Sequence, residues 1–117
     1  MTRVQLWRNK AAHSFSCKAA GHAGFASKGS DIVCAAETIL LRTAMRVLEE
    51  SGMCFSANET KRGFLEFMAS VPSGSAVDSE SALVERLFCV ADFLATGLKS
   101  LEVEYPLHIA VEELIEQ

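Results

Sequence analysis

The sequence predicts an α+β domain in which two helices pack on one mostly antiparallel sheet. Two runs near the amino terminus alternate apolar and polar residues, which is typical of strands. Two longer segments, over residues 32–50 and 79–99, carry apolar residues at helical spacing, and a pair of strand-like runs precedes each of them. The order ββαββα, followed by a last short strand, predicts a single two-layer domain over residues 1–117.

The first strand pair is expected over residues 3–8 and 14–19. In the second run, Phe15 and Cys17 fall on one face, whereas the serines and Lys18 fall on the other. A turn begins between the two runs, so we expect them to form a hairpin.

A loop over residues 21–30 follows the hairpin and contains Gly21, Gly24 and Gly29. Glycine adopts backbone angles that are closed to other residues. We therefore expect this loop to turn sharply or to move.

The first helix is expected over residues 32–50, with Ser30 or Asp31 as its amino-terminal cap and Gly52 as its stop. Very few charges precede Arg42 in this segment. Its first half is therefore expected to be buried on most sides.

The second half of the chain repeats the pattern. Residues 53–56 and 63–70 are expected to form a strand pair, and residues 79–99 a helix with an apolar stripe. Pro106 then separates this helix from a last strand over residues 107–111.

Composition excludes several classes of protein. The chain has 117 residues, half of them hydrophobic, and a net charge of −4 with no basic stripe, which argues against a nucleic-acid-binding module. Its four cysteines form no C-x-x-C pair, so zinc-finger and thioredoxin functions lack their motif. We see no signal-peptide core and no apolar run long enough to span a membrane, and we expect a reduced, cytoplasmic protein.

Residues 21–38, GHAGFASKGSDIVCAAET, carry the candidate chemistry. A cysteine near a helix start has a lowered thiol pKa, and the free amides there can stabilise an oxyanion. His22 can reach Cys34 only if the loop folds back over the helix start. From these residues alone, the other interpretation is a turn histidine followed by a small buried thiol.

This segment resembles the ribosomal-processing cysteine protease family Prp. The resemblance rests on GHA, on the spacing of twelve between His22 and Cys34, and on DIVCAA, and the element order and length agree. It implies a bacterial cytoplasmic endopeptidase that removes an amino-terminal extension from the large-subunit ribosomal protein numbered twenty-seven. It also implies a homodimer, Cys34 as nucleophile and His22 as base, and no cofactor.

The residues around this pair have alternative roles. Asp31 either orients His22, as the third group of a triad does, or serves the helix start, as its cap or as a first-turn acid that the helix dipole favours. Thr38 stands where the family often has serine, and it either contacts substrate or bonds back to the helix backbone.

The loop between His22 and Cys34 is expected to act as a mobile lid over the site. Within it, FASKG (residues 25–29) resembles the family's cleavage sequence, so it is a substrate mimic, a simple lid or a coincidence. The residues expected to form the lid are Gly21, Gly24, Phe25, Ser27, Lys28 and Gly29.

A different class of function fits the same residues. The chain could be a non-enzymatic ribosome-associated or regulatory module that binds a peptide on this fold, with Cys34 inert. The pH dependence of thiol labelling separates the two functions, because a catalytic cysteine reacts well below the ordinary thiol pKa.

Overall fold

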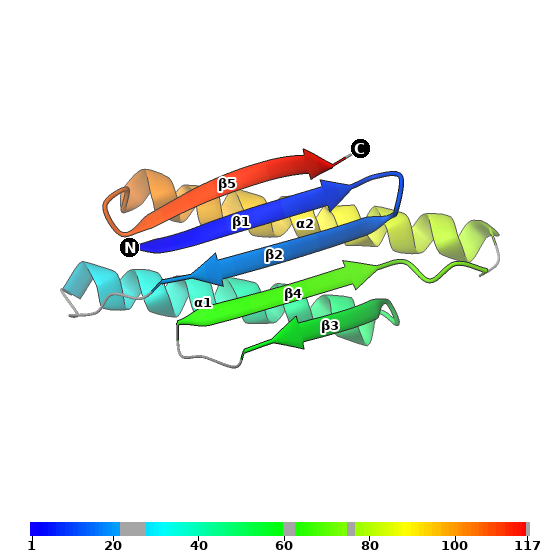
Figure 1. The fold of residues 1–117 in the computed structure, drawn as a ribbon, viewed down its shortest axis with the longest axis horizontal. Coiled ribbons are helices and arrows are strands. Elements are labelled where there is room, and N and C mark those ends of the chain that lie inside the picture. Colours follow the sequence, from blue (N-terminus) through cyan, green and yellow to red (C-terminus); the bar gives the residue numbers. More distant parts are fainter. Residues whose placement is uncertain (22–27, 60–62, 75–76, 117) are drawn as a thin grey trace.

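A computed structural model describes most of the chain. It covers residues 1–21, 28–59, 63–74 and 77–116, and describes only the backbone of 28–31, 77–79 and 116. Two helices cover one face of a five-stranded sheet (Figure 1), which confirms the predicted fold class. The elements are β1 (Thr2–Asn9), β2 (Ser14–Ala20), α1 (Lys28–Glu50), β3 (Cys54–Asn58), β4 (Phe64–Ser70), α2 (Val77–Glu104) and β5 (Ile109–Glu116).

The strands lie in the order β3-β4-β2-β1-β5. The two hairpins pair antiparallel and meet at β2 and β4, whereas β5 runs parallel to β1. The sheet is therefore mostly antiparallel, as predicted. The register places Leu6 of β1 opposite Cys17 of β2, and Cys17 opposite Phe67 of β4, so three buried side chains line up across the sheet.

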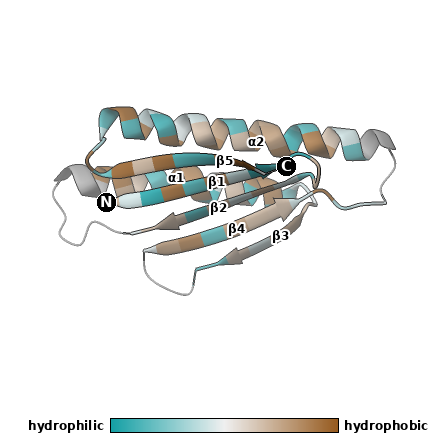
Figure 2. Cartoon of the chain, turned by 45° about the horizontal axis from the view of Figure 1, so that its top comes forward, coloured by the Kyte–Doolittle hydropathy of each residue, from teal (hydrophilic) through white to brown (hydrophobic). Residues whose placement is uncertain are grey.

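The core lies between the sheet and the helices. Figure 2 shows apolar residues recurring along α2 between polar ones, and the inward-facing leucines of this helix are buried. Phe15 and Phe67 meet edge to face, with ring centroids 5.9 Å apart. Burying each large apolar side chain of this kind contributes roughly 1.5–3 kcal/mol.

Helix α1 begins earlier than predicted. It starts at Lys28, so Lys28 and Gly29 belong to the helix and not to the loop, and neither Ser30 nor Asp31 precedes it as a cap. The prediction was wrong because Gly29 was taken as a loop residue, although glycine costs a helix only about 1 kcal/mol relative to alanine.

The first half of α1 is also more exposed than predicted. Ile32 is 54% exposed and Ile39 65% exposed, because α1 lies in an outer layer with the sheet on one side and α2 beside it. The predicted end of the helix is confirmed. Gly52 has a φ of 81°, the left-handed conformation that terminates many helices.

The last two elements are longer than predicted. Helix α2 extends from Val77 to Glu104, since the buried stripe continues to Leu101 and the first helix breaker is Pro106. Strand β5 starts at Ile109 and continues to Glu116, through acidic residues that did not look like strand from sequence.

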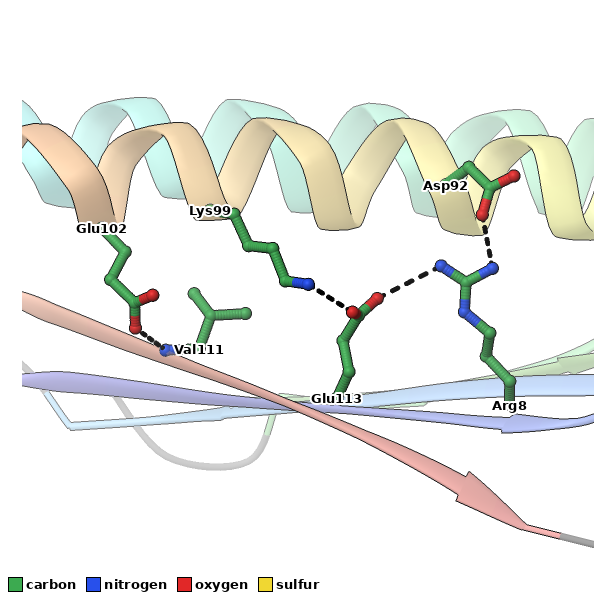
Figure 3. A network of polar contacts seen from close by, with 6 residues as sticks. All are labelled: Arg8, Asp92, Lys99, Glu102, Val111 and Glu113. Atoms are coloured by element: carbon green, nitrogen blue, oxygen red, sulfur yellow. Dashed lines mark hydrogen bonds and ion pairs between the residues drawn. The ribbon is translucent and has the colours of Figure 1, made fainter.

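Polar contacts explain why an acidic segment forms a strand here (Figure 3). Arg8 of β1 bonds Asp92 of α2 at 2.5 Å and Glu113 of β5 at 3.2 Å, and Lys99 of α2 also bonds Glu113. The Glu102 carboxylate accepts a bond from the Val111 amide at 2.7 Å. We call Arg8, Asp92, Lys99, Glu102 and Glu113 the β5 anchor.

The other cysteines differ from one another. Cys17 is buried in the core, and burial, followed by the nearby Glu37, raises the pKa of its thiol. Cys54 lies exposed on β3. Cys89 is exposed on α2, outside the apolar stripe. Neither α1 nor α2, in the parts that the structure describes, has a stretch long and apolar enough to cross a membrane.

Candidate active site

Three strand ends meet where the candidate site begins. The last residue of β2, Ala20, lies opposite Arg3 near the start of β1 and opposite Phe64 at the start of β4. The Gly21 amide then donates to the Gly63 carbonyl at 3.0 Å. The chain therefore leaves the middle of the sheet in a fixed position immediately before His22.

Gly21 is required at this position. Its φ is 103°, a conformation that side chains rarely adopt, and an added Cβ would lie 2.4 Å from the Met1 carbonyl oxygen. Only glycine satisfies both conditions. This glycine, which begins the GHA motif, directs the backbone into His22.

His22 itself lies outside the described residues, as do Gly24, Phe25 and Ser27 of the predicted lid. The distance between His22 and Cys34 is therefore not part of the described geometry, and the dyad stays a prediction. The lid and the FASKG substrate mimic stay predictions as well.

Cys34 lies in the second turn of α1 and is partly buried. Helices leave their first four amides without intrahelical partners, and here these belong to residues 28–31, so the Cys34 amide is not one of them. Side chains in a helix lean toward its amino terminus. The Cys34 side chain therefore leans toward the turn with the free amides.

Cys34 shares one row of α1 with Thr38 and Arg42, at helical spacings of four. Thr38 is exposed, which leaves its hydroxyl accessible. Arg42 bonds Glu59, just beyond the end of β3, at 3.0 Å. The row therefore lies on the flank of α1 that faces the end of β3, and neither Arg42 nor Glu59 was predicted as part of the site.

Asp31 lies in the first turn of α1, one helical turn before Cys34. Because the helix begins before it, the alternative in which Asp31 caps the helix is wrong. A role in orienting His22 stays a prediction.

Glu37 is the site neighbour that sequence reasoning missed. It is only 7% exposed, and its carboxyl forms a hydrogen bond with the Thr2 side chain at the start of β1. Burial raises the pKa of this carboxyl to about 7, although the bond from Thr2 lowers it in part. The signal in the sequence was a single acid within the buried row that Val33 and Leu41 define.

A separate hollow lies on the sheet face that the helices leave uncovered. Its volume is about 360 Å³, and its lining includes Trp7, Ser16 and Met68. Of the predicted site residues whose side chains the structure describes, Cys34 and Thr38 lie outside this lining.

Solved structures with this fold were found by structural similarity. The SMU.848 protein of Streptococcus mutans superposes with a TM-score of 0.73 at 21% identity, over 99% of this chain and 96% of that chain. The essential ribosomal processing protease Prp of Staphylococcus aureus, in complex with a substrate peptide, gives 0.73 at 19% identity, over 97% and 100%. The same protease with a covalently linked product peptide gives 0.70 at 17% identity, over 97% and 100%.

Sequence comparison supplies the family. No curated protein matches the chain significantly. A family model described as cysteine protease Prp matches residues 1–110, which includes β1, the GHA motif, Cys34 and both helices. The chain therefore belongs to the Prp family of cysteine proteases.

Proposed function

We propose that the chain is an endopeptidase that removes an amino-terminal extension from the large-subunit ribosomal protein numbered twenty-seven. The observation that carries the proposal is the family match over residues 1–110, which contain Cys34 near the start of α1. The shared fold with the Staphylococcus aureus protease, described as a ribosomal processing protease bound to a substrate peptide, supports the choice of substrate.

In the proposed reaction, Cys34 is the nucleophile and His22 the acid and base. The Cys34 thiolate attacks the scissile carbonyl, and the carbon–nitrogen bond breaks as imidazolium His22 gives its proton to the leaving amine. A water molecule, deprotonated by His22, then attacks the thioester and releases the carboxylate product and the thiol. The amides of the first turn of α1 stabilise the oxyanion in both steps.

The proposal includes supporting groups around this pair. Asp31 orients His22, and Thr38, exposed one turn after Cys34, contacts the bound peptide. The segment between Gly21 and the start of α1 at Lys28 covers the peptide when it is bound. We further propose a homodimer in the cytoplasm, which sedimentation and fractionation of the producing cells would test.

Cleavage of a synthetic extension peptide tests the nucleophile. Cys34→Ala should abolish cleavage, whereas Cys89→Ala, a matched change of an exposed helical cysteine, should leave it unchanged. His22→Ala should reduce kcat by roughly 10³-fold or more, the scale seen when a triad member is lost. Continued cleavage by Cys34→Ala would show that another residue is the nucleophile.

Peptide-resolved alkylation separates the protease from a binding module. A catalytic Cys34 should react well below the pH at which the exposed thiols of Cys54 and Cys89 react. If all three react over the same pH range, and the peptide is bound but not cut, the protein is a peptide-binding module.

A further inference from the structure

Glu37 follows Cys34 by three residues on the same helix. Side chains at this spacing are neighbours on a helix surface, with Cβ atoms roughly 5–6 Å apart. Glu37 is nonetheless directed into the core, with 7% of its surface exposed. Among the residues whose side chains the structure describes, it and Thr2 are the two buried polar ones.

Thr2, which bonds the Glu37 carboxyl, is itself firmly held. It is 3% exposed, and its amide donates to the His108 carbonyl at 2.9 Å. Thr2 also lies against Gly21, because its Cα is 3.5 Å from the position that a Cβ would occupy there. One hydrogen bond therefore connects the helix that carries Cys34 with the backbone against which the residue before His22 is packed.

We propose that Glu37 is a positioning residue, whose bond to Thr2 sets the helix that carries Cys34 against the strand end that carries His22. The inference rests on the proposed function, in which these two residues react together. In a cysteine protease, the thiol and the imidazole must lie within hydrogen-bond reach of each other. The bond between Glu37 and Thr2 limits how far α1 can shift relative to the start of β1, against which Gly21 packs.

The Glu37 carboxyl has an environment that favours its neutral form. Cys17 faces it from β2, Cys34 precedes it on its own helix, and Thr2 from β1 does not titrate. The buried side chains described from α2 and β5 are apolar, and no described cation forms an ion pair with Glu37. As an acid, it can donate and accept at once, whereas ionisation introduces an uncompensated charge near Cys34.

This environment gives the proposal a pH signature. The pKa of Glu37 is raised to about 7, so this carboxyl ionises near neutral pH. Above that pH, Glu37 carries a negative charge three residues after Cys34, and this charge opposes the build-up of negative charge on the attacking sulfur. Activity should therefore decline as the pH rises through about 7.

Four variants test the proposal: Glu37→Gln, Glu37→Ala, Thr2→Val and Thr2→Ser. Glu37→Gln keeps the bond and cannot ionise, so it should retain activity at about pH 6 and lose the decline above pH 7. Glu37→Ala and Thr2→Val should each lower kcat by about 10²-fold with little change in KM, the scale expected for a misplaced catalytic group. Thr2→Ser keeps the hydroxyl and should retain kcat.

Combining Glu37→Ala with Thr2→Val should cost no more than either change alone, because both remove one interaction. The rate of Cys34 alkylation by iodoacetamide, measured by mass spectrometry against pH, gives a readout that needs no peptide substrate. In Glu37→Gln this rate should exceed that of the unchanged chain by severalfold above pH 7, and should equal it at about pH 5.

The inference is overturned if Glu37→Gln keeps the decline above pH 7, or if the two single losses multiply in the double variant. Should Glu37→Ala fail to fold, the pH dependence of activity in Glu37→Gln still tests the inference. Failure of the proposed function gives a different result, namely cleavage by Cys34→Ala. The two failures are therefore distinguishable.

Discussion

Two regions of the molecule use glutamate in opposite ways. In the β5 anchor, Glu113 lies between Arg8 and Lys99, and the bond from Lys99 is the main reason that its pKa is lowered. Glu37 lies beside Thr2 and Cys17, and its burial raises its pKa to about 7. One carboxylate is stabilised as an anion, whereas the other is stabilised as a neutral acid.

The difference separates contacts that hold the fold from contacts that adjust the site. Glu113 supports the attachment of an edge strand, and its ionised form is compatible with water nearby. Glu37 makes folding less favourable at any pH at which its buried carboxyl ionises. A buried acid with a shifted pKa next to a nucleophile is a common feature of functional sites.

The largest expected effect lies at Gly21, on the site side of the comparison. Gly21→Ala adds left-handed strain of about 1–2 kcal/mol and a clash worth about 1–3 kcal/mol more, since the Cβ would overlap the Met1 carbonyl. Gly52→Ala is the matched control, with positive φ but nothing within 4 Å of the added Cβ. Urea denaturation should show a larger loss for Gly21→Ala, and cleavage should fall only in that variant. Equal losses would show that the close approach to Met1 does not matter.

The pH dependence of stability should have opposite signs for the two glutamates. The folded pKa of Glu37 is raised from 4.5 to about 7. Its contribution to the free energy of unfolding is therefore full below pH 4.5 and is lost as the pH rises to about 7. This loss amounts to about 3 kcal/mol. The folded pKa of Glu113 is lowered, so its contribution is present above 4.5 and is lost as the pH falls through the folded pKa.

Denaturation midpoints across pH check this contrast. Glu37→Gln should remove the decline in the denaturation midpoint between about pH 4.5 and 7. Glu113→Gln should remove only the loss of stability at acidic pH. If the denaturation midpoint of Glu37→Gln still declines over this pH range, another group causes the decline.

A smaller effect is expected in the β5 anchor. Arg8→Met removes the bonds to Asp92 and Glu113 but keeps most of the apolar stem, and should cost about 1 kcal/mol at low salt. The cost should shrink in high salt, because ions screen exposed pairs. Thr2→Val should show no such salt dependence. If the loss of stability depends on salt in both Arg8→Met and Thr2→Val, the two regions do not differ in the kind of contact that holds them.

The smallest effect is expected for Arg46→Ala, which removes an exposed pair with Glu50 within α1. Both side chains are largely exposed, so the denaturation midpoint and the cleavage rate should stay unchanged. A measurable loss would mean that exposed pairs matter more here than the comparison assumes.

Much of the fold was predictable because local patterns agree with the tertiary structure. The alternation of Phe15 and Cys17 identified β2, and the leucine stripe identified α2, since both patterns reflect burial against one core. Element ends were less predictable. The start of α1 at Lys28 depends on a helical Gly29, and β5 depends on cations that lie far away in sequence.

The site was predictable only in part. The motif identified Cys34, and the family match over residues 1–110 includes it. Glu37 was not singled out, because its significance comes from Thr2, which lies far from it in the sequence and meets it only in the folded chain. Arg42 and Glu59 were missed for the same reason.

The most direct test of the account is to trap the covalent intermediate. The chain is mixed with an extension peptide, quenched in acid within the first turnover, digested and analysed by mass spectrometry. We predict that the amino-terminal fragment of the peptide is attached to Cys34 as a thioester and is absent from Cys34→Ala. Cleavage with the fragment on another residue, or with no covalent adduct in repeated early quenches, would contradict Cys34 as the nucleophile.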